Sequence, residues 1–341
     1  MKIAIHYNPG NFSERWIKYC KENGIDHKIV NAYDSNIISQ VSDCDAFMWH
    51  HHHSDPKDVL FAKQLLYSLE ESGKRVFPDF RTGWHFDDKV GQKYLLESIG
   101  APLVPSYVFY SKKEALKWVN HTTFPKVFKL RGGAGASNVK LAHTASEARK
   151  FIRKAFGQAF PQFDRCGYLK ERFRKWRLGK DTFLGVCKGM GRLLIPTDFA
   201  KMHGREKGYA YFQDFMPNNS YDIRVCVVGD KAFALKRLTR KGDFRASGSG
   251  NIIYDKTQID DICVSIAFDI NKKLKCQSVA FDFVFNKDKT PLIVEISYGY
   301  AVKAYDSCEG YWSSDMQWHK GNNFDFCGWM VEEILKKKTN I

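Results

Sequence analysis

The chain has 341 residues, 44% of them hydrophobic, which allows two or three compact units with real cores. This composition excludes an intrinsically disordered chain, and no apolar run approaches the roughly 18 residues that a membrane-spanning helix needs. The formal net charge of +15 favours an anionic partner, such as nucleotide phosphates, an anionic substrate, nucleic acid or an acidic membrane.

The N-terminal residues and the cysteines indicate the cellular compartment in which the protein is expected. The apolar run before His6 is too short for a signal peptide. The nine cysteines include no C-x-x-C pair, and several lie inside apolar runs, as free thiols in a reducing compartment do. We therefore expect a cytoplasmic protein without membrane insertion.

Residues 1–85 alternate short apolar strands with helical stretches. The expected strands span residues 2–6, 27–31, 45–49 and 75–77, and the expected helices span residues 13–22 and 56–71. Such alternation is typical of a parallel α/β sheet. The first turn contains no G-x-G-x-x-G, so a dinucleotide site has no support. We expect a small N-terminal α/β domain at 1–85.

Four consecutive histidines, His50–His53, follow one of these strands. Ligands of open α/β sheets gather at the carboxyl ends of strands, so a histidine there can contact a substrate. Adjacent side chains alternate in direction, and all four therefore rarely bind one metal ion. We expect a polar loop with at most one functional histidine.

Residues 86–210 form the next unit. Expected elements are a helix at 88–98, a strand at 107–110, a helix at 112–120, and strands at 126–130 and 139–141 around a glycine-rich loop. The order strand, loop, strand predicts a hairpin lid. Residues 157–210 are basic and glycine-punctuated without a clear period, so we interpret them as an insertion.

Residues 211–341 have an antiparallel pattern. We expect a hairpin of strands 221–228 and 232–238, a helix at 259–273, a hairpin of strands 278–285 and 292–297, and a closing helix at 327–337. Two lobes thus follow the N-terminal domain.

The glycine-rich loop after Lys129 is the first candidate for chemistry. Backbone N–H groups of such loops bind anions, because glycine lets the chain approach a phosphate closely. The loop is not a Walker A motif, since its lysine precedes the glycines instead of following them. From these residues alone, a plain glycine turn beside a solvated lysine is an equal alternative.

Asp282 and Glu295 are lone acids within apolar predicted strands. An isolated buried carboxylate is costly unless it is paired or bound to metal. Two such acids on adjacent strands can hold one or two Mg²⁺ ions. The alternatives are acids that face solvent, or a structural ion pair.

Two further segments carry arginine. Asp222 and Arg224 share one strand face near Arg237, an arrangement that suits phosphate binding or an exposed cross-strand ion pair. Arg245 lies in a second glycine-rich segment, residues 243–251, which is either another anion cradle or a flexible loop.

The order of these motifs resembles the ATP-grasp superfamily, especially its small carboxylate–amine ligases. The matching segments are Asp87–Lys89, Phe124–Lys129, Tyr211–Met216, Asp222–Val225 with Arg237, and Asp282 with Glu295. They resemble the family's "DK" opening, phosphate-binding strand, adenine hinge, "D-I-R-V…R" hairpin and magnesium acids. The resemblance covers roughly residues 86–300, and the segments Asp243–Gly250 and Gly310–His319 look like a subgroup found beside bacterial surface-polysaccharide genes.

The resemblance implies an α/β fold in which two ATP-grasp lobes, 86–210 and 211–341, follow the N-terminal pre-ATP-grasp domain. It implies ATP and Mg²⁺ as cofactors. Lys129, Arg237 and Arg245 would act on the transferred phosphate. Asp282, Glu295 and Ser297 would bind metal, although the family usually has Asn where Ser297 stands. The nucleotide-binding residues would be Lys89, Lys129, Gly132, Gly133, Gly135, Ser137, Gln213, Asp214, Phe215, Met216, Asp222 and Arg224.

The implied function is an ADP-forming ligase that joins a small-molecule or sugar-linked anionic carboxylate to an amine through an acyl phosphate. One alternative is a kinase of the same fold that phosphorylates a polyanionic alcohol such as an inositol phosphate. A second is a basic protein that binds polyanions through residues 170–180. The two apolar-strand acids would repel phosphate without a metal, so nucleic acid is not the expected partner. The sequence predicts no oligomeric state.

Overall fold

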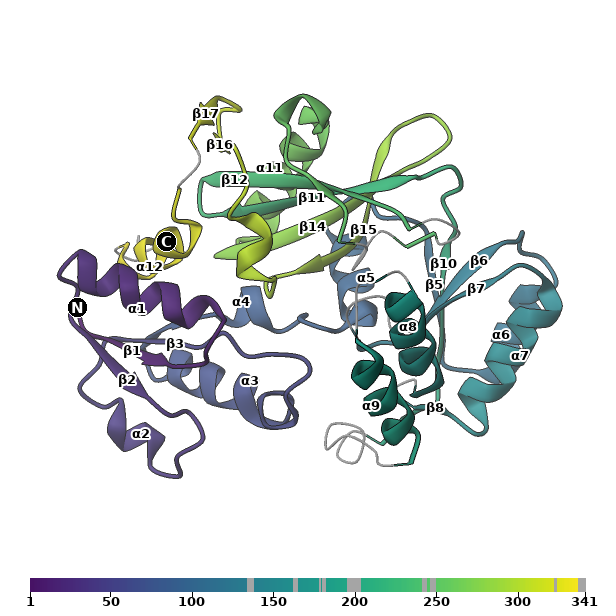
Figure 1. Cartoon of the computed structure of the whole chain (residues 1–341), viewed down its shortest axis with the longest axis horizontal. Helices are drawn as coiled ribbons and strands as arrows, with labels where there is room; N and C mark the ends of the chain where they lie inside the picture. Colours follow the sequence, from purple (N-terminus) through teal and green to yellow (C-terminus); the bar gives the residue numbers. More distant parts are fainter. Residues whose placement is uncertain are drawn as a thin grey trace.

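The computed structural model describes residues 1–133, 138–161, 165–177, 179, 182–194, 204–240, 244–245, 250–321 and 324–336 (Figure 1). Three main sheets organise this part of the chain, and each has its own layer of helices.

The N-terminal unit is a four-stranded parallel sheet in the order β2-β1-β3-β4. Its strands are β1 (Ile3–His6), β2 (His27–Val30), β3 (Ala46–Met48) and β4 (Arg75–Phe77), and its helices are α1 (Phe12–Glu22), α2 (Ile37–Gln40), α3 (Pro56–Glu71) and α4 (Phe80–Gly83). Ile3 and Ile5 face one core and Ala4 faces another, since helical crossovers cover both faces of a parallel sheet. The expected parallel α/β unit is confirmed, whereas the short helices α2 and α4 were not predicted.

The middle unit is an antiparallel sheet in the order β5-β10-β6-β7. Its elements are β5 (Ser106–Phe109), α6 (Lys112–Val119), β6 (Lys126–Lys129), β7 (Val139–Ala142), α7 (Ala145–Phe156) and β10 (Ala210–Asp214). The helices α6 and α7 pack on one face, over a core that includes Phe128 and Phe212. Strand β10 belongs to this sheet, so the expected lobe boundary at 210/211 falls inside a strand.

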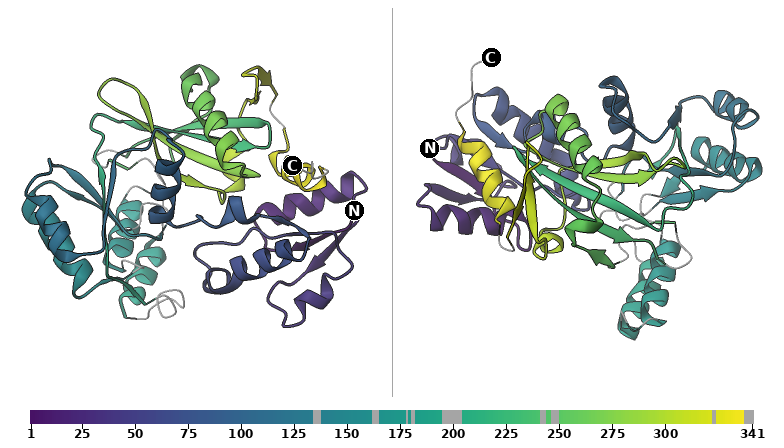
Figure 2. Two further views of the ribbon diagram at one scale, coloured as in Figure 1. Left: turned by 180° about the vertical axis from the view of Figure 1, so that it is seen from behind. Right: turned by 90° about the horizontal axis from the view of Figure 1, so that it is seen from above.

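The basic insertion is a helical hairpin. Helices α8 (Arg165–Arg177) and α9 (Phe183–Leu194) run between β8 (Phe160–Pro161) and β9 (Arg205–Glu206), which pair with each other. Figure 2 shows this hairpin projecting from the body of the molecule. The sequence analysis found no helical period here, because several large apolar side chains of these helices face solvent and leave no clean buried stripe.

The third sheet has the order β15-β14-β11-β12-β16-β17, and β13 pairs with β12. Its strands are β11 (Tyr221–Val228), β12 (Lys231–Leu238), β13 (Ile252–Ile253), β14 (Ser278–Phe285), β15 (Pro291–Ser297), β16 (Gly310–Ser313) and β17 (Trp318–Lys320), with the short 3₁₀ helices η1 (Lys256–Gln258) and η2 (Val302–Tyr305). Helices α5 (Lys89–Ser98) and α11 (Asp261–Leu274) contribute to the core on one face. Both predicted hairpins are confirmed, whereas β16 and β17 were not expected.

The last helix, α12 (Phe326–Leu335), returns to the N-terminal unit and lies beside α1 (Figure 1). The Tyr19 hydroxyl donates to the Glu332 carboxylate over 2.8 Å, and the Arg75 guanidinium donates to the carbonyl of Ile334 over 2.8 Å. In the described part of the chain, eight cysteines are free and all but Cys187 are buried. None of the described helices combines the length and apolar character needed to cross a membrane.

Candidate active site

A cavity of about 240 Å³ lies between the middle and third sheets, and the N-terminal unit forms part of its wall. One part of the lining is apolar and comprises Val104, Val127, Val139, Phe215, Met216, Val284 and Val294. The other part is charged and comprises Asp87, Lys89, Lys129, Asp214, Asp222, Arg224, Arg245, Asp282 and Glu295. The cavity can therefore take a ligand that carries both apolar and highly charged groups.

Strand alternation places the charged residues of the third sheet on the cavity side. Along β11, Ile223 and Val225 enter the core beneath α11. Asp222 and Arg224 alternate with them along the strand, so both face the cavity on the other side of the sheet. On β14, Phe281 and Phe283 enter that same core, and Asp282 between them faces the cavity.

Three of these side chains, Asp222, Arg224 and Asp282, form an ion-pair cluster with Arg237 of β12. Arg224 donates to both carboxylate oxygens of Asp282 over 2.5 and 2.6 Å. Arg237 donates to both oxygens of Asp222 over 2.7 Å, and its Nη2 atom also lies 2.9 Å from a carboxylate oxygen of Asp282. The registers Asp222↔Arg237 and Arg224↔Asp282 place the partners directly opposite each other. The cluster is electrically balanced, which makes its burial tolerable.

The cluster keeps Asp282 ionised. Burial opposes the charged form, but the guanidinium groups of Arg224 and Arg237 outweigh it and hold the pKa of Asp282 well below its usual range. Asp282 therefore offers a permanent negative charge at the cavity wall.

A β-bulge in β15 brings Glu295 to this wall. The partner of Asp282 is Glu295, but the partner of the next residue, Phe283, is Ile293, so Val294 is an extra residue on β15. Ile293 and Ile296 consequently both enter the core under α11, although strict alternation would place them on opposite faces. The bulge thus leaves Glu295 facing Asp282 across the two strands.

Lys89 connects Glu295 to the glycine-rich loop. Its ammonium lies 3.3 Å from a Glu295 carboxylate oxygen and donates to the carbonyl of Gly133 over 2.7 Å. Burial alone would lower the pKa of Lys89, yet Glu295 and Asp87 outweigh it and raise that pKa above the usual value. Lys89 is therefore a buried, fully charged cation.

Lys129 is the second buried cation of the cavity. Its ammonium donates to the side-chain oxygen of Gln213 over 2.5 Å, and the Gln213 amide donates to Ser106 over 3.1 Å. Burial lowers the pKa of Lys129 to about 8, against the attraction of Glu295. Gln213 thus orients Lys129, and its predicted contact with adenine stays a prediction.

The start of the glycine-rich loop is held by Asp87, a residue that sequence reasoning used only as part of a motif. The Asp87 carboxylate accepts a hydrogen bond from the N–H of Gly133 over 2.8 Å. Gly133 has φ +105°, which favours glycine, and a Cβ on Gly132 would lie 3.2 Å from the Asp87 carboxylate. Burial raises the pKa of Asp87 to about 6.

The N-terminal unit contributes His53 to the cavity wall, and Phe86, whose ring centroid lies 5.9 Å from that of His53, lines the cavity too. The other histidines of the run have structural contacts: His50 stacks on Phe12 with ring centroids 3.8 Å apart, and the backbone carbonyl of His51 accepts from Tyr298. No hydrogen bond to the His53 ring is present among the described residues. His53 is the histidine of this run that lines the cavity, and its predicted contact with a ligand stays a prediction.

Comparisons with known proteins bear on the fold. Residues 203–310 match the family model described as RimK-like ATP-grasp domain. A RimK domain ATP-grasp protein from Sphaerobacter thermophilus aligns over 98% of this chain and 100% of its own, with TM-score 0.57 and 13% identity. The D-cycloserine synthetase structure aligns over 98% and 100%, with TM-score 0.61 and 12% identity. The chain has the ATP-grasp fold.

A third ATP-grasp neighbour is the N5-carboxyaminoimidazole synthetase from Staphylococcus aureus, which aligns over 98% of this chain and 77% of its own, with TM-score 0.58 and 12% identity. No curated protein matches the sequence significantly. The resemblance to a subgroup from surface-polysaccharide gene clusters stays a prediction.

The predicted site residues divide into three groups in the ATP-grasp structure. The cavity is lined by Lys89, Lys129, Gly133, Gln213, Asp214, Phe215, Met216, Asp222, Arg224, Arg245, Asp282, Glu295 and Ser297. Arg237 and Gly132 do not line it: Arg237 lies behind Asp222 and Asp282, and Gly132 packs on Asp87. Gly135 and Ser137 lie outside the described residues.

Asp214, a predicted hinge residue, and Ser297, a predicted metal ligand, already have partners within the protein. The Asp214 carboxylate is paired with Lys126 over 2.5 Å, so its charge is already balanced. The Ser297 hydroxyl donates to the carbonyl of Gly299 over 2.8 Å, which leaves only its lone pairs for a cation.

The carboxylates of Asp282 and Glu295 fit a hard divalent cation. Such ions take oxygen ligands and complete their shell with water and substrate phosphates. The two acids face each other on β14 and β15 and already attract the cations Lys89, Arg224 and Arg237. In the described part of the chain, no group of three His, Cys, Asp or Glu side chains is arranged to hold a metal. A cation here would therefore depend on ligands from a bound substrate.

Proposed function

We propose that the chain is a Mg²⁺- and ATP-dependent, ADP-forming ligase that joins a carboxylate to an amine. The observation that carries the proposal is the charged end of the cavity, where two buried lysines meet two facing carboxylates between the two sheets of an ATP-grasp fold. The neighbours include proteins whose names describe synthetases, and one carboxylase domain was solved with MgADP.

We place the nucleotide in the cavity in one direction. The adenine would lie at the apolar end, between Val127 and Val294 and beside the chain at Phe215 and Met216. The phosphates would then reach Lys129, whose ammonium is fixed by Gln213. Arg237 would act through Asp222 and Asp282 as a positioning residue, and Arg245, which also borders the cavity, would meet the transferred group.

Asp282 and Glu295 would hold Mg²⁺, which when bound neutralises phosphate charge and orients it for in-line transfer. Glu295 would exchange its contact with Lys89 for the cation, and Lys89 would turn to phosphate. The protein contribution is thus positioning and charge neutralisation in a partly water-excluded site.

The chemistry would proceed in two transfers. A carboxylate oxygen of the substrate attacks the γ-phosphorus, the bond to the ADP oxygen breaks, and an acyl phosphate forms. A neutral amine then attacks the carbonyl carbon, the carbon–oxygen bond to phosphate breaks, and the amine proton leaves with the phosphate. We place the acceptor at the wall that holds His53, whose neutral ring can accept a hydrogen bond from the amine, since burial lowers its pKa to about 3.

Hydroxylamine trapping tests this function. The purified chain would be incubated with ATP, Mg²⁺, hydroxylamine and a panel of small and sugar-linked carboxylic acids, and hydroxamate would be measured. An acid-dependent hydroxamate with equimolar ADP is the expected result. A phosphorylated alcohol without any hydroxamate would establish the kinase alternative, which the +15 charge favours. Polyanion binding without any nucleotide requirement would exclude both enzymes.

The pKa of Lys129 predicts how nucleotide binding depends on pH. Because the free site releases the Lys129 proton near pH 8, phosphate binding above that pH must take the proton back. The affinity for a non-hydrolysable ATP analogue should therefore fall as pH rises past 8, by up to about tenfold per pH unit. Calorimetric titration at a series of pH values measures this affinity. Lys129→Arg keeps its charge and should remove this fall; an unchanged pH profile in that variant would contradict the assignment.

A further inference from the structure

The outer end of the α8–α9 hairpin carries an exposed aromatic and aliphatic cluster. Its members are Phe173 and Trp176 on α8 and Phe183 and Leu184 on α9, and we call these four residues the hairpin tip. The ring centroids of Phe173 and Trp176 lie 5.6 Å apart, and those of Trp176 and Phe183 lie 5.7 Å apart. The three rings therefore form one continuous apolar surface that joins both helices, and Leu184 follows Phe183 directly in the sequence.

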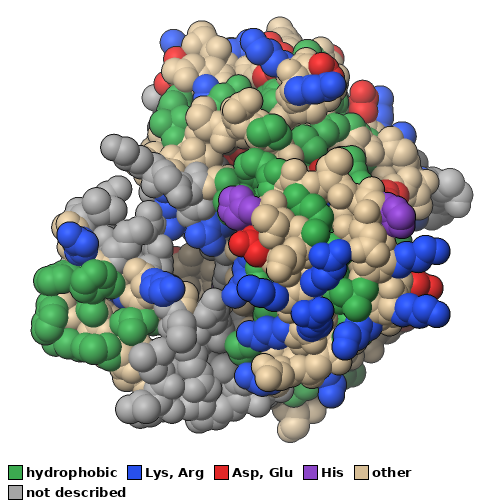
Figure 3. All heavy atoms as spheres, turned by 90° about the vertical axis from the view of Figure 1, so that its right-hand side faces the viewer, with side chains coloured by type: hydrophobic (Ala, Val, Ile, Leu, Met, Phe, Trp, Pro, Cys, Tyr) green, Lys and Arg blue, Asp and Glu red, His purple; other side chains and the backbone are tan. Residues whose placement is uncertain are grey.

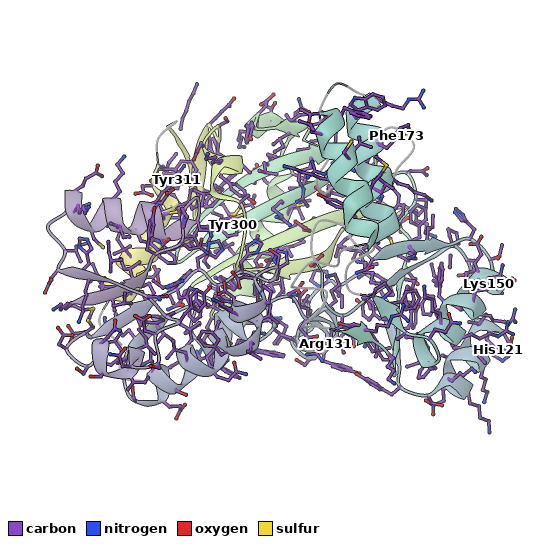
Figure 4. All side chains as sticks on the ribbon, turned by 60° about the horizontal axis from the view of Figure 1, so that its bottom comes forward. His121, Arg131, Lys150, Phe173, Tyr300 and Tyr311 are labelled. Carbon is purple, nitrogen blue, oxygen red and sulfur yellow. The ribbon has the colours of Figure 1, made fainter. Side chains whose placement is uncertain are left out.

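The tip is open to solvent. Phe183 is 59% exposed and Leu184 is 71% exposed, and Phe173 and Trp176 are also exposed. Figure 4 labels Phe173 beside the helices of the hairpin. Monomeric proteins rarely leave such a contiguous apolar surface uncovered, and it commonly marks a site of interaction.

The hairpin is also strongly basic. Residues 165–194 contain nine Lys or Arg residues and only two acidic residues, a large part of the chain's total surplus. Figure 3 shows the apolar surface of the hairpin at the left, with further Lys and Arg side chains on the same face of the molecule over α6 and α7. On α6 and α7, Lys112, Lys117 and Lys150 are exposed.

We propose that the hairpin tip docks the protein on the surface of an anionic lipid bilayer. Segments that lie in the bilayer interface combine Trp, Phe and Leu with Lys and Arg. Their rings and aliphatic groups enter the acyl boundary, and their cations meet the lipid headgroups. No described helix is long and apolar enough to span a bilayer, so the contact is peripheral.

Charge complementarity favours a bilayer over the other occupants. A second copy of the chain would bring two basic hairpins together, and their like charges would repel. A nucleic acid would meet the cations and stack on the rings, but it offers nothing apolar to the aliphatic Leu184 and Met190, which are also exposed. An acidic bilayer accommodates the charges and both kinds of apolar side chain.

Co-sedimentation of the full chain with vesicles tests the proposal. Phosphatidylcholine vesicles with and without phosphatidylglycerol would be compared at low and high salt, with Leu184→Glu and a matched control, Leu60→Glu. Leu60 on α3 is 64% exposed, so the control repeats the substitution and its charge change away from the hairpin. Both sites face solvent, and thermal unfolding should show both variants folded as the wild type.

The expected result is binding that needs the anionic lipid and weakens with salt. Leu184→Glu should lower the partition coefficient at least about tenfold, because burial of one leucine contributes that much or more. Leu60→Glu should stay within about twofold, since its side chain touches no lipid. Equal losses in both variants, or no binding to anionic vesicles, would overturn the proposal. Light scattering tests the alternative of a second copy. If the wild type is a dimer and Leu184→Glu is a monomer, the tip is a dimer interface instead.

Discussion

Lys129→Met should remove the stabilisation that a non-hydrolysable ATP analogue with Mg²⁺ gives the wild type. Ligand at about 100 times its Kd adds about 2.7 kcal/mol, which for a chain of this size is roughly 4 °C in Tm. Loss of the buried ammonium should weaken binding about a hundredfold or more and leave a shift below about 1 °C. Thermal unfolding with and without the analogue measures this, and turnover should fall at least about a hundredfold.

Lys140→Met is the matched control for that experiment. Lys140 lies on β7, beside the strand of Lys129, but its ammonium points over the Phe160 ring and does not line the cavity. The control should keep the full shift. A Lys129→Met protein that keeps nearly the wild-type shift would remove Lys129 from the phosphate site. If the Tm of the wild type does not shift at millimolar nucleotide, both the ligase and the kinase functions are excluded.

Asp282→Asn should lower both stability and magnesium dependence. The substitution leaves Arg224 without its carboxylate and Arg237 with one partner instead of two. Breaking a buried ion pair on one side costs about 3 kcal/mol, so Tm should fall by roughly 4 °C. The stabilisation by nucleotide should also lose its Mg²⁺ requirement, because one of two facing carboxylates is gone. Turnover should be abolished.

The pH dependence separates the carboxylate of Asp282 from a packing effect. A carboxyl whose folded pKa is depressed contributes stability above its unfolded pKa and loses it as pH falls through the folded pKa. The deficit of Asp282→Asn should therefore be full at neutral pH and shrink as pH falls below about 4. A deficit that stays constant down to low pH would show that the asparagine merely packs badly.

Asp222→Asn is the matched variant for the magnesium result. Asp222 is about as buried as Asp282 and shares Arg237 with it, but it has no carboxylate opposite it on the neighbouring strands. It should destabilise the protein yet keep the Mg²⁺-dependent shift. Equal loss of that dependence in both variants would mean that the whole cluster, and not Asp282, governs cation binding.

The sequence patterns predicted the order of elements wherever one face of each element is buried. The parallel N-terminal unit follows from short apolar strands that alternate with helical stretches, and the hairpins of β11 with β12 and β14 with β15 follow from alternating apolar residues. The hairpin of α8 and α9 escaped prediction because its tip is apolar yet exposed, so no buried stripe repeats at helical spacing. The sequence analysis did not predict β10 as a strand of the middle sheet, because its partners β5 and β6 are distant in sequence.

For the candidate site, the sequence by itself determined which side chains are out of place in apolar strands: Lys129, Asp282 and Glu295. Only the tertiary structure decided what each one touches. Gln213 reaches Lys129 across two paired strands, and a bulge at Val294 turns Glu295 toward Asp282. Alternation along one strand has a fixed period of two, so it cannot reveal a bulge or the partner on another strand, and both are set by packing between distant segments.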